Sequence, residues 1–199
     1  NYDAEDYAYF QKSIILGAAN KTQEKLALLQ KFVKQYPKSA LIGDVYMEMA
    51  NTYLAAESYS LAVAPLLQIT SNTALAAWHP AAYLKTGVAY FNMDKNSEAL
   101  STFTTLLAKF PNTLEAESSI EYIRNIFVEN QKPQDFVAFM EANGKAVSDT
   151  EADSLTYQAA MLRYEQKDLA GTKNGLSAYI DKFANGAHIL EAHFIMSSI

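Results

Sequence analysis

The chain has 199 residues, of which 50% are hydrophobic, 19% are charged and 12% are aromatic. A chain of this length with this share of apolar residues can bury a core, which excludes intrinsic disorder. The net charge is −6 without a basic stretch, so we expect no nucleic-acid partner. Cysteine is absent, which removes disulfides, thiolate catalysis and cysteine-based zinc sites.

The apolar stretches are far shorter than the roughly 20 residues that a membrane-spanning helix needs. We therefore expect no membrane insertion of this segment. The chain starts at Asn1 without methionine or a secretion signal, and it stops at Ile199 within an apolar helix pattern. We interpret it as a piece of a longer protein, whose targeting signals would lie elsewhere.

Short turn-forming segments recur along the chain, as in a repeat protein. Ser39 and Thr73 occupy equivalent places in two of them and lie 34 residues apart, and Thr113 follows after a further 40. The four segments are Tyr36-Pro37-Lys38-Ser39, Ile69-Thr70-Ser71-Asn72-Thr73, Phe110-Pro111-Asn112-Thr113 and Phe183-Ala184-Asn185-Gly186.

Between these segments, apolar residues recur every three or four positions in two runs, with a polar break between the runs. Residues 43–72 show this pattern twice, around Tyr46 and Tyr53 and then around Ala62 and Leu66. Such spacing is typical of amphipathic helices and not of strands. Each unit is therefore expected to be a pair of antiparallel helices of about a dozen residues.

The fold class predicted is all-α. We expect an α-solenoid of about five antiparallel helix hairpins plus the first helix of a further repeat. Four repeats are expected in residues 1–143, at about 6–38, 43–72, 80–112 and 116–143, and a fifth repeat with the start of another in residues 144–199. The polar segment 143–150 is the expected seam between the two parts.

Residues at the turns suit helix ends. Pro37 and Pro111 lack an N–H group and are expected to end the helices before them. Ser39, Thr73 and Asn112 are expected N-caps, Asn112 with Glu115 in capping-box spacing. For the helix after residue 148, either Ser148 with Glu151 or Thr150 with Asp153 is a candidate cap.

Small residues lie within the apolar faces of the expected helices. Ala50 and Gly87 fall on first helices of a hairpin, and Ala62 and Ala99 fall on second helices. Two helices approach closely only where side chains are small, so these positions are predicted to be the helix contacts.

The run Tyr83, Gly87, Tyr90, Ala99, Phe103 and Pro111 resembles the tetratricopeptide repeat signature. The run Tyr46, Ala50, Tyr53, Ala62 and Leu66 is similar. The first unit departs from the signature because Lys25 stands where an alanine belongs, and the fourth has Phe136 at that place. In the order of its motifs the chain also resembles large multi-repeat proteins of Bacteroidetes cell envelopes.

This resemblance implies a concave groove lined by the free faces of the first helices. Carried over position by position, the partner-binding residues would be Tyr7, Phe10, Met47, Asn51, Leu54, Leu84, Val88, Phe91, Asn92 and Asn125. Several are large and apolar, which suits a partner helix or extended segment. The alternative is that some of them belong to the core between repeats.

No catalytic motif, phosphate loop or metal motif occurs, so we predict no enzyme activity, no cofactor and no metal. His188 and His193 would lie about 140° apart around a helix and could not share an ion comfortably.

We therefore predict a non-enzymatic scaffold for protein–protein interaction in the periplasm or cell envelope. A cytoplasmic location stays open. One alternative is a structural or self-associating spacer without a groove ligand. Another is a carbohydrate-binding or hydrolytic helical domain, which the single Trp78 does not favour.

Overall fold

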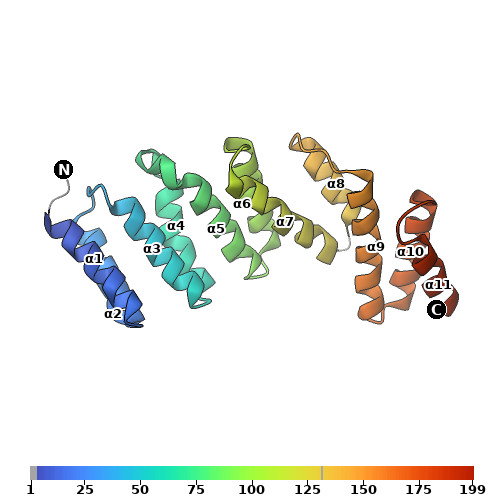
Figure 1. Cartoon of the computed structure of the whole chain (residues 1–199), viewed down its shortest axis with the longest axis horizontal. Helices are drawn as coiled ribbons and strands as arrows, with labels where there is room; N and C mark the ends of the chain where they lie inside the picture. The colour runs from blue at the N-terminus through green and yellow to red at the C-terminus, as the bar shows by residue number, and fades with distance from the viewer. Residues whose placement is uncertain (1–3, 131) are drawn as a thin grey trace. The chain divides into compact units, whose positions relative to one another are not determined.

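The computed structural model describes residues 4–130 and 132–199. Every regular element in these residues is helical, and the helices pack pairwise in a repeat array, which confirms the predicted fold class (Figure 1). The chain forms two compact units, Asn1–Ser119 and Ile120–Ile199. The seam predicted at 143–150 and the exact repeat limits stay predictions.

The first unit consists of successive helical hairpins. Its α-helices and one short 3₁₀ helix are α1 (Ala4–Ala18), α2 (Thr22–Gln35), α3 (Ile42–Ala55), α4 (Tyr59–Thr70), η1 (Thr73–Trp78), α5 (His79–Phe91) and α6 (Asn96–Lys109). Within it, α1 packs on α2, α3 on α4 and α5 on α6, while α2 contacts α3 and α4 contacts α5 (Figure 1). The second helix of one hairpin therefore packs both on its own first helix and on the first helix of the next hairpin, as α2 and α4 do.

The helix α7 (Leu114–Glu129) begins in the first unit and continues into the second. The second unit then contains α8 (Pro133–Ala142), α9 (Asp149–Glu165), α10 (Leu169–Lys182) and α11 (Ile189–Ser198). Here α8 packs on α9, α9 pairs with α10, and α10 contacts α11.

The small residues lie at the helix contacts, as predicted. Ala50, Ala62 and Ala99 are completely buried. A Cβ atom built on Gly87 would lie 2.2 Å from Cε1 of Phe103 in the paired helix. Only glycine allows α5 and α6 to approach this closely.

The turns inside the hairpins share one backbone conformation. Among the described residues other than glycine, positive φ angles occur at Asn20 (57°), Glu57 (53°), Asp94 (57°) and Lys167 (61°). Each lies between the two helices of a hairpin, and the next residue donates its N–H to a carbonyl five positions back, as Ser58 does to Tyr53 at 2.9 Å. This left-handed helix ending is usually formed by glycine. Four hairpins thus end their first helix in the same way with four different residues.

The helix caps agree with the sequence in part. The Ser148 hydroxyl accepts from the Glu151 N–H at 3.2 Å, as expected. The Asn112 prediction was wrong by one residue, because Thr113 accepts the N–H of Ala116 at 3.2 Å. The Thr73 prediction was also wrong by one, because Asn72 accepts the N–H of Ala74.

Ser39 does not cap α3, whose N-cap is Leu41 without a side-chain bond. The Ser39 hydroxyl accepts from the Leu41 N–H at 3.1 Å and donates to the buried carboxylate of Asp6 at 2.6 Å. It therefore joins the start of the second hairpin to the start of the first. The correction has a physical reason, since the hydroxyl accepts the N–H of Leu41, which precedes α3, and not an N–H of the first turn of α3.

Candidate protein-interaction surface

The ten residues predicted to bind a partner lie on the first helices of the hairpins or, for Asn92, directly after one. They are Tyr7 and Phe10 on α1, Met47, Asn51 and Leu54 on α3, Leu84, Val88 and Phe91 on α5, Asn92 directly after α5, and Asn125 on α7. Asn125 belongs to the second unit and is exposed. The other nine belong to the first unit.

These nine residues differ in exposure. Tyr7 is 49% exposed and Asn92 is exposed, while the remaining seven are half-buried. Phe10 and Met47 pack against the core cluster that contains Phe32 and Val45. Parts of these two side chains therefore contribute to the core between hairpins, and their role toward a partner stays a prediction.

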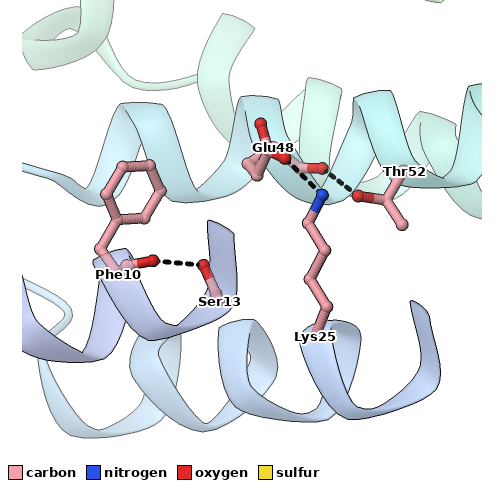
Figure 2. Close-up of polar contacts among 5 residues, drawn as sticks. All are labelled: Phe10, Ser13, Lys25, Glu48 and Thr52. Carbon is pink, nitrogen blue, oxygen red and sulfur yellow. Dashed lines mark hydrogen bonds and ion pairs between the residues drawn. The ribbon is translucent and has the colours of Figure 1, made fainter. Parts of the chain in front are cut away.

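A hollow of about 280 Å³ opens on this face between α1, α2 and α3. It is lined by Gly17, Thr22, Lys25, Glu48, Asn51, Thr52, Ala55 and Ala56. Figure 2 shows Lys25 reaching from α2 to the carboxylate of Glu48 on α3, with Phe10 of α1 nearby. Of the ten predicted residues, Asn51 lines this hollow.

The ion pair explains why a lysine is tolerated at an alanine position. A Cβ atom on Gly17 would lie 3.1 Å from Cδ of Lys25, so the glycine leaves room for the lysine stem. The Lys25 and Glu48 side chains are only 12% and 25% exposed, and each charge compensates the other. The hydroxyl of Thr52 donates to the Glu48 carbonyl at 2.7 Å and lies beside the pair (Figure 2).

The sequence interpretation missed Lys25, Glu48 and Gly17 as members of this surface. A lysine at a buried small-residue position was a usable signal, because a buried cation needs an acidic partner. The partner is 23 residues away on the next hairpin, so only the stacking of the hairpins identifies it.

The histidine His188 and the tryptophan Trp78 both have packing contacts in the described part of the chain. Within residues 4–130 and 132–199, no group of three or more histidines and acidic residues could hold a metal ion. His188 directly precedes α11, and its ring stacks on Tyr157 with centroids 4.3 Å apart. Trp78 packs over Gly43 and donates from Nε1 to Asp44 at 3.3 Å, which is a packing role.

No helix in the described part of the chain is long and apolar enough to cross a membrane.

The comparison with protein families matches residues 7–39 and 81–113 to the tetratricopeptide repeat model. Two of the hairpins are thus of the tetratricopeptide type. The first matched segment covers most of α1 and all of α2, the hairpin in which Lys25 replaces the small residue. The second covers most of α5 and all of α6, the hairpin of Gly87 and Phe103. The family is typically non-catalytic and generally serves protein–protein interaction.

Solved structures similar to the chain have TPR-like repeats as well. The nearly identical TPR-like repeats of a candidate kinesin light chain from Podosopora anserina align with a TM-score of 0.48 and 15% identity, over 90% of this chain and 97% of that one. A single-substitution variant of the same repeats aligns with a TM-score of 0.49 and 15% identity, over 89% and 94%. No curated protein matches the chain.

Proposed function

We propose that the first unit is a protein-interaction scaffold that binds a partner helix or an extended segment on the faces of α1, α3 and α5. The observation that carries this proposal is the row of half-buried side chains on successive first helices. Met47, Leu84 and Phe91 are each half-buried, and the amides of Asn51 and Asn92 lie on or directly after the same helices. Apolar anchors with neighbouring hydrogen-bonding groups are the usual features of peptide-binding grooves.

The hollow beside Asn51 gives this surface a polar end. The Lys25 and Glu48 charges and the amide of Asn51 can orient a partner's backbone, while the apolar residues supply the buried area. A partner that fits would present apolar side chains along one face and polar groups at one end.

We further propose that this chain acts in the bacterial periplasm or cell envelope. The support is the order of its motifs, which is similar to that of large envelope repeat proteins. Fractionation of the native cells with an antibody against the chain tests this directly. Recovery in the cytosolic fraction alone would overturn it.

A structural spacer is the second candidate, because Phe10 and Met47 pack against the core cluster. If all the half-buried residues serve the core between hairpins, no partner is needed on this face.

Charge-introducing variants separate the two candidates. Asn51→Arg with Asn92→Arg alters the proposed surface, and Gln68→Arg with Ser101→Arg adds the same charge at exposed positions of α4 and α6. In affinity capture from the native extract, the scaffold proposal expects the first variant to lose partners that the wild type and the second variant retain. Identical captured proteins for all three would favour the spacer.

A further inference from the structure

A second hollow lies in the second unit, where α8, α9 and α10 meet. Its volume is about 390 Å³, and it is the larger of the two hollows described. It contains none of the residues of the first surface, so a ligand bound here would be independent of the proposed function.

The floor of this hollow consists of small apolar residues. Ala159 and Ala160 of α9 face Gly175 and Ala178 of α10. A Cβ atom on Gly175 would lie 3.0 Å from the Cβ atom of Ala160, so the two helices approach closely here. Their close approach leaves a shallow apolar trough without large side chains to fill it.

The two ends of the trough carry positive charge. At one end, Lys182 donates to the side-chain oxygen of Gln134 on α8, and the Gln134 amide donates to the Thr156 hydroxyl at 3.2 Å. At the other end lies Arg163, whose Nη1 is 3.9 Å from a carboxylate oxygen of Asp168. The two side chains form an ion pair, but the separation is longer than a hydrogen bond, so the guanidinium keeps donors for another acceptor. Among the described residues that line the hollow, none is acidic.

The spacing of the two ends defines what fits. Thr156 and Arg163 are seven residues apart on α9, which is about 10 Å along a helix. In an extended peptide the side chains of residues i, i+2 and i+4 lie on one face, and residues i and i+4 are about 13 Å apart. Two carboxylates placed four residues apart would therefore point toward the trough together, with the side chain midway between them over the alanine floor. The long side chains of Arg163 and Lys182 can cover the remaining difference in length.

We propose that this hollow binds an extended acidic peptide segment through two carboxylates at Arg163 and Lys182 and small apolar side chains over Ala159, Gly175 and Ala178. The argument is charge complementarity. Two cations at the ends of an apolar trough favour a partner with two anionic groups separated by apolar side chains.

The test is titration of the ¹⁵N-labelled chain with the peptide acetyl-Asp-Ser-Val-Ser-Asp-amide, followed by NMR, with the Asn-Ser-Val-Ser-Asn peptide as its neutral counterpart. We expect the acidic peptide to shift the amide signals of Ala159, Gly175 and Ala178. The neutral peptide should bind at least about tenfold more weakly.

Two variants and one control locate the contacts. Arg163→Glu with Lys182→Glu should weaken binding of the acidic peptide at least about tenfold. The control Lys173→Glu, on the exposed side of α10, should change the affinity less than about twofold. Ala178→Leu keeps the charge, fills the trough and should also abolish binding, so the test remains decisive if the charge reversal unfolds the unit.

The proposal is overturned if the acidic peptide shifts none of these signals, or if it binds the Arg163→Glu, Lys182→Glu variant as tightly as the wild type. It is also overturned if inorganic phosphate alone shifts the same signals with equal affinity, because the trough would then be a simple anion site. Asn51→Arg with Asn92→Arg should leave peptide binding unchanged, which separates this result from that of the first surface.

Discussion

Phe103 of α6 occupies the space into which a side chain at Gly87 of α5 would extend. A Cβ atom at position 87 would lie 2.2 Å from Cε1 of the ring and 2.6 Å from Cζ. Phe103 is itself completely buried, so the ring cannot turn out into solvent. This contact sets how closely the two helices of the third hairpin approach.

Gly87→Ala is expected to destabilise the protein by roughly 1–3 kcal/mol. Alanine favours a helix over glycine by about 1 kcal/mol, but overlap with the Phe103 ring outweighs that gain. Urea unfolding followed by circular dichroism measures the change. Adding Phe103→Leu removes the ring atoms and should recover part of the loss in the Gly87→Ala background. A Gly87→Ala variant more stable than the wild type would contradict the assigned helix contact.

The ion pair between Lys25 and Glu48 should behave as a coupled unit. Lys25→Met and Glu48→Gln each leave one partly buried charge alone, so the double variant should lose less free energy of unfolding than the two single losses together. Both side chains retain some exposure, so we expect a coupling of about 1 kcal/mol. A double-mutant cycle by urea unfolding gives this number, and strictly additive losses would show that the pair contributes nothing.

The left-handed hairpin turns predict a stabilising substitution. Glu57 is exposed and has a φ of 53°, a conformation that glycine adopts without steric cost. Glu57→Gly should therefore raise the free energy of unfolding by roughly 0.5–1 kcal/mol. The matched control is Ser101→Gly, an exposed position in the middle of α6, which should lower stability by about the same amount. If both variants are destabilised alike, the turn at Glu57 does not have this conformation in solution.

Tyr179 should make the stability of the second unit decrease at alkaline pH. Burial raises the pKa of Tyr179 to about 12, and a hydrogen bond with Asp153 contributes to the increase. Below the ordinary tyrosine pKa of about 10, the hydroxyl is protonated in both the folded and the unfolded chain. Between about pH 10 and about pH 12 the unfolded chain releases this proton and the folded chain keeps it, so stability falls by up to about 1.4 kcal/mol per pH unit.

Tyr179→Phe should therefore lose less stability than the wild type when the pH rises from about 9 to about 11. At neutral pH the variant should have a lower free energy of unfolding than the wild type, because the His188 N–H loses the Tyr179 hydroxyl that accepts it at 3.0 Å. Urea midpoints at the two pH values measure both effects. An equal loss of stability in the two proteins between these pH values would show that Tyr179 is not responsible for the decrease.

Much of the fold follows from local patterns in the sequence. The spacing of apolar residues predicts the helices, and small residues such as Gly87 and Ala99 predict which faces meet, because both signals lie within one hairpin. The N-cap residues were less predictable, since Asn112 and Thr113 are both good capping residues. Which of them caps the helix depends on the residue at which the helical backbone begins. The turn at Glu57 carries no glycine to mark its left-handed conformation.

The sites were less predictable than the fold because they depend on several hairpins at once. Lys25 is unusual in its own hairpin, yet its partner Glu48 becomes visible only when α3 is stacked on α2. The trough beside Arg163 forms because Ala159 and Gly175 have small side chains or none. In a sequence, small residues predict a close helix contact as readily as a surface trough. Whether Met47 and Leu84 bind a partner stays a prediction.

The most direct test of the proposed scaffold is photocrosslinking from single positions in the native cells. A photoreactive phenylalanine analogue at Leu84 of α5 lies on the proposed surface, and the same analogue at Leu67, an exposed position of α4, is the control. We predict a discrete crosslinked partner from Leu84 that disappears with Asn51→Arg and Asn92→Arg, and none from Leu67. Crosslinks of the same kind from both positions, or from neither, would contradict a partner-binding face on the first helices.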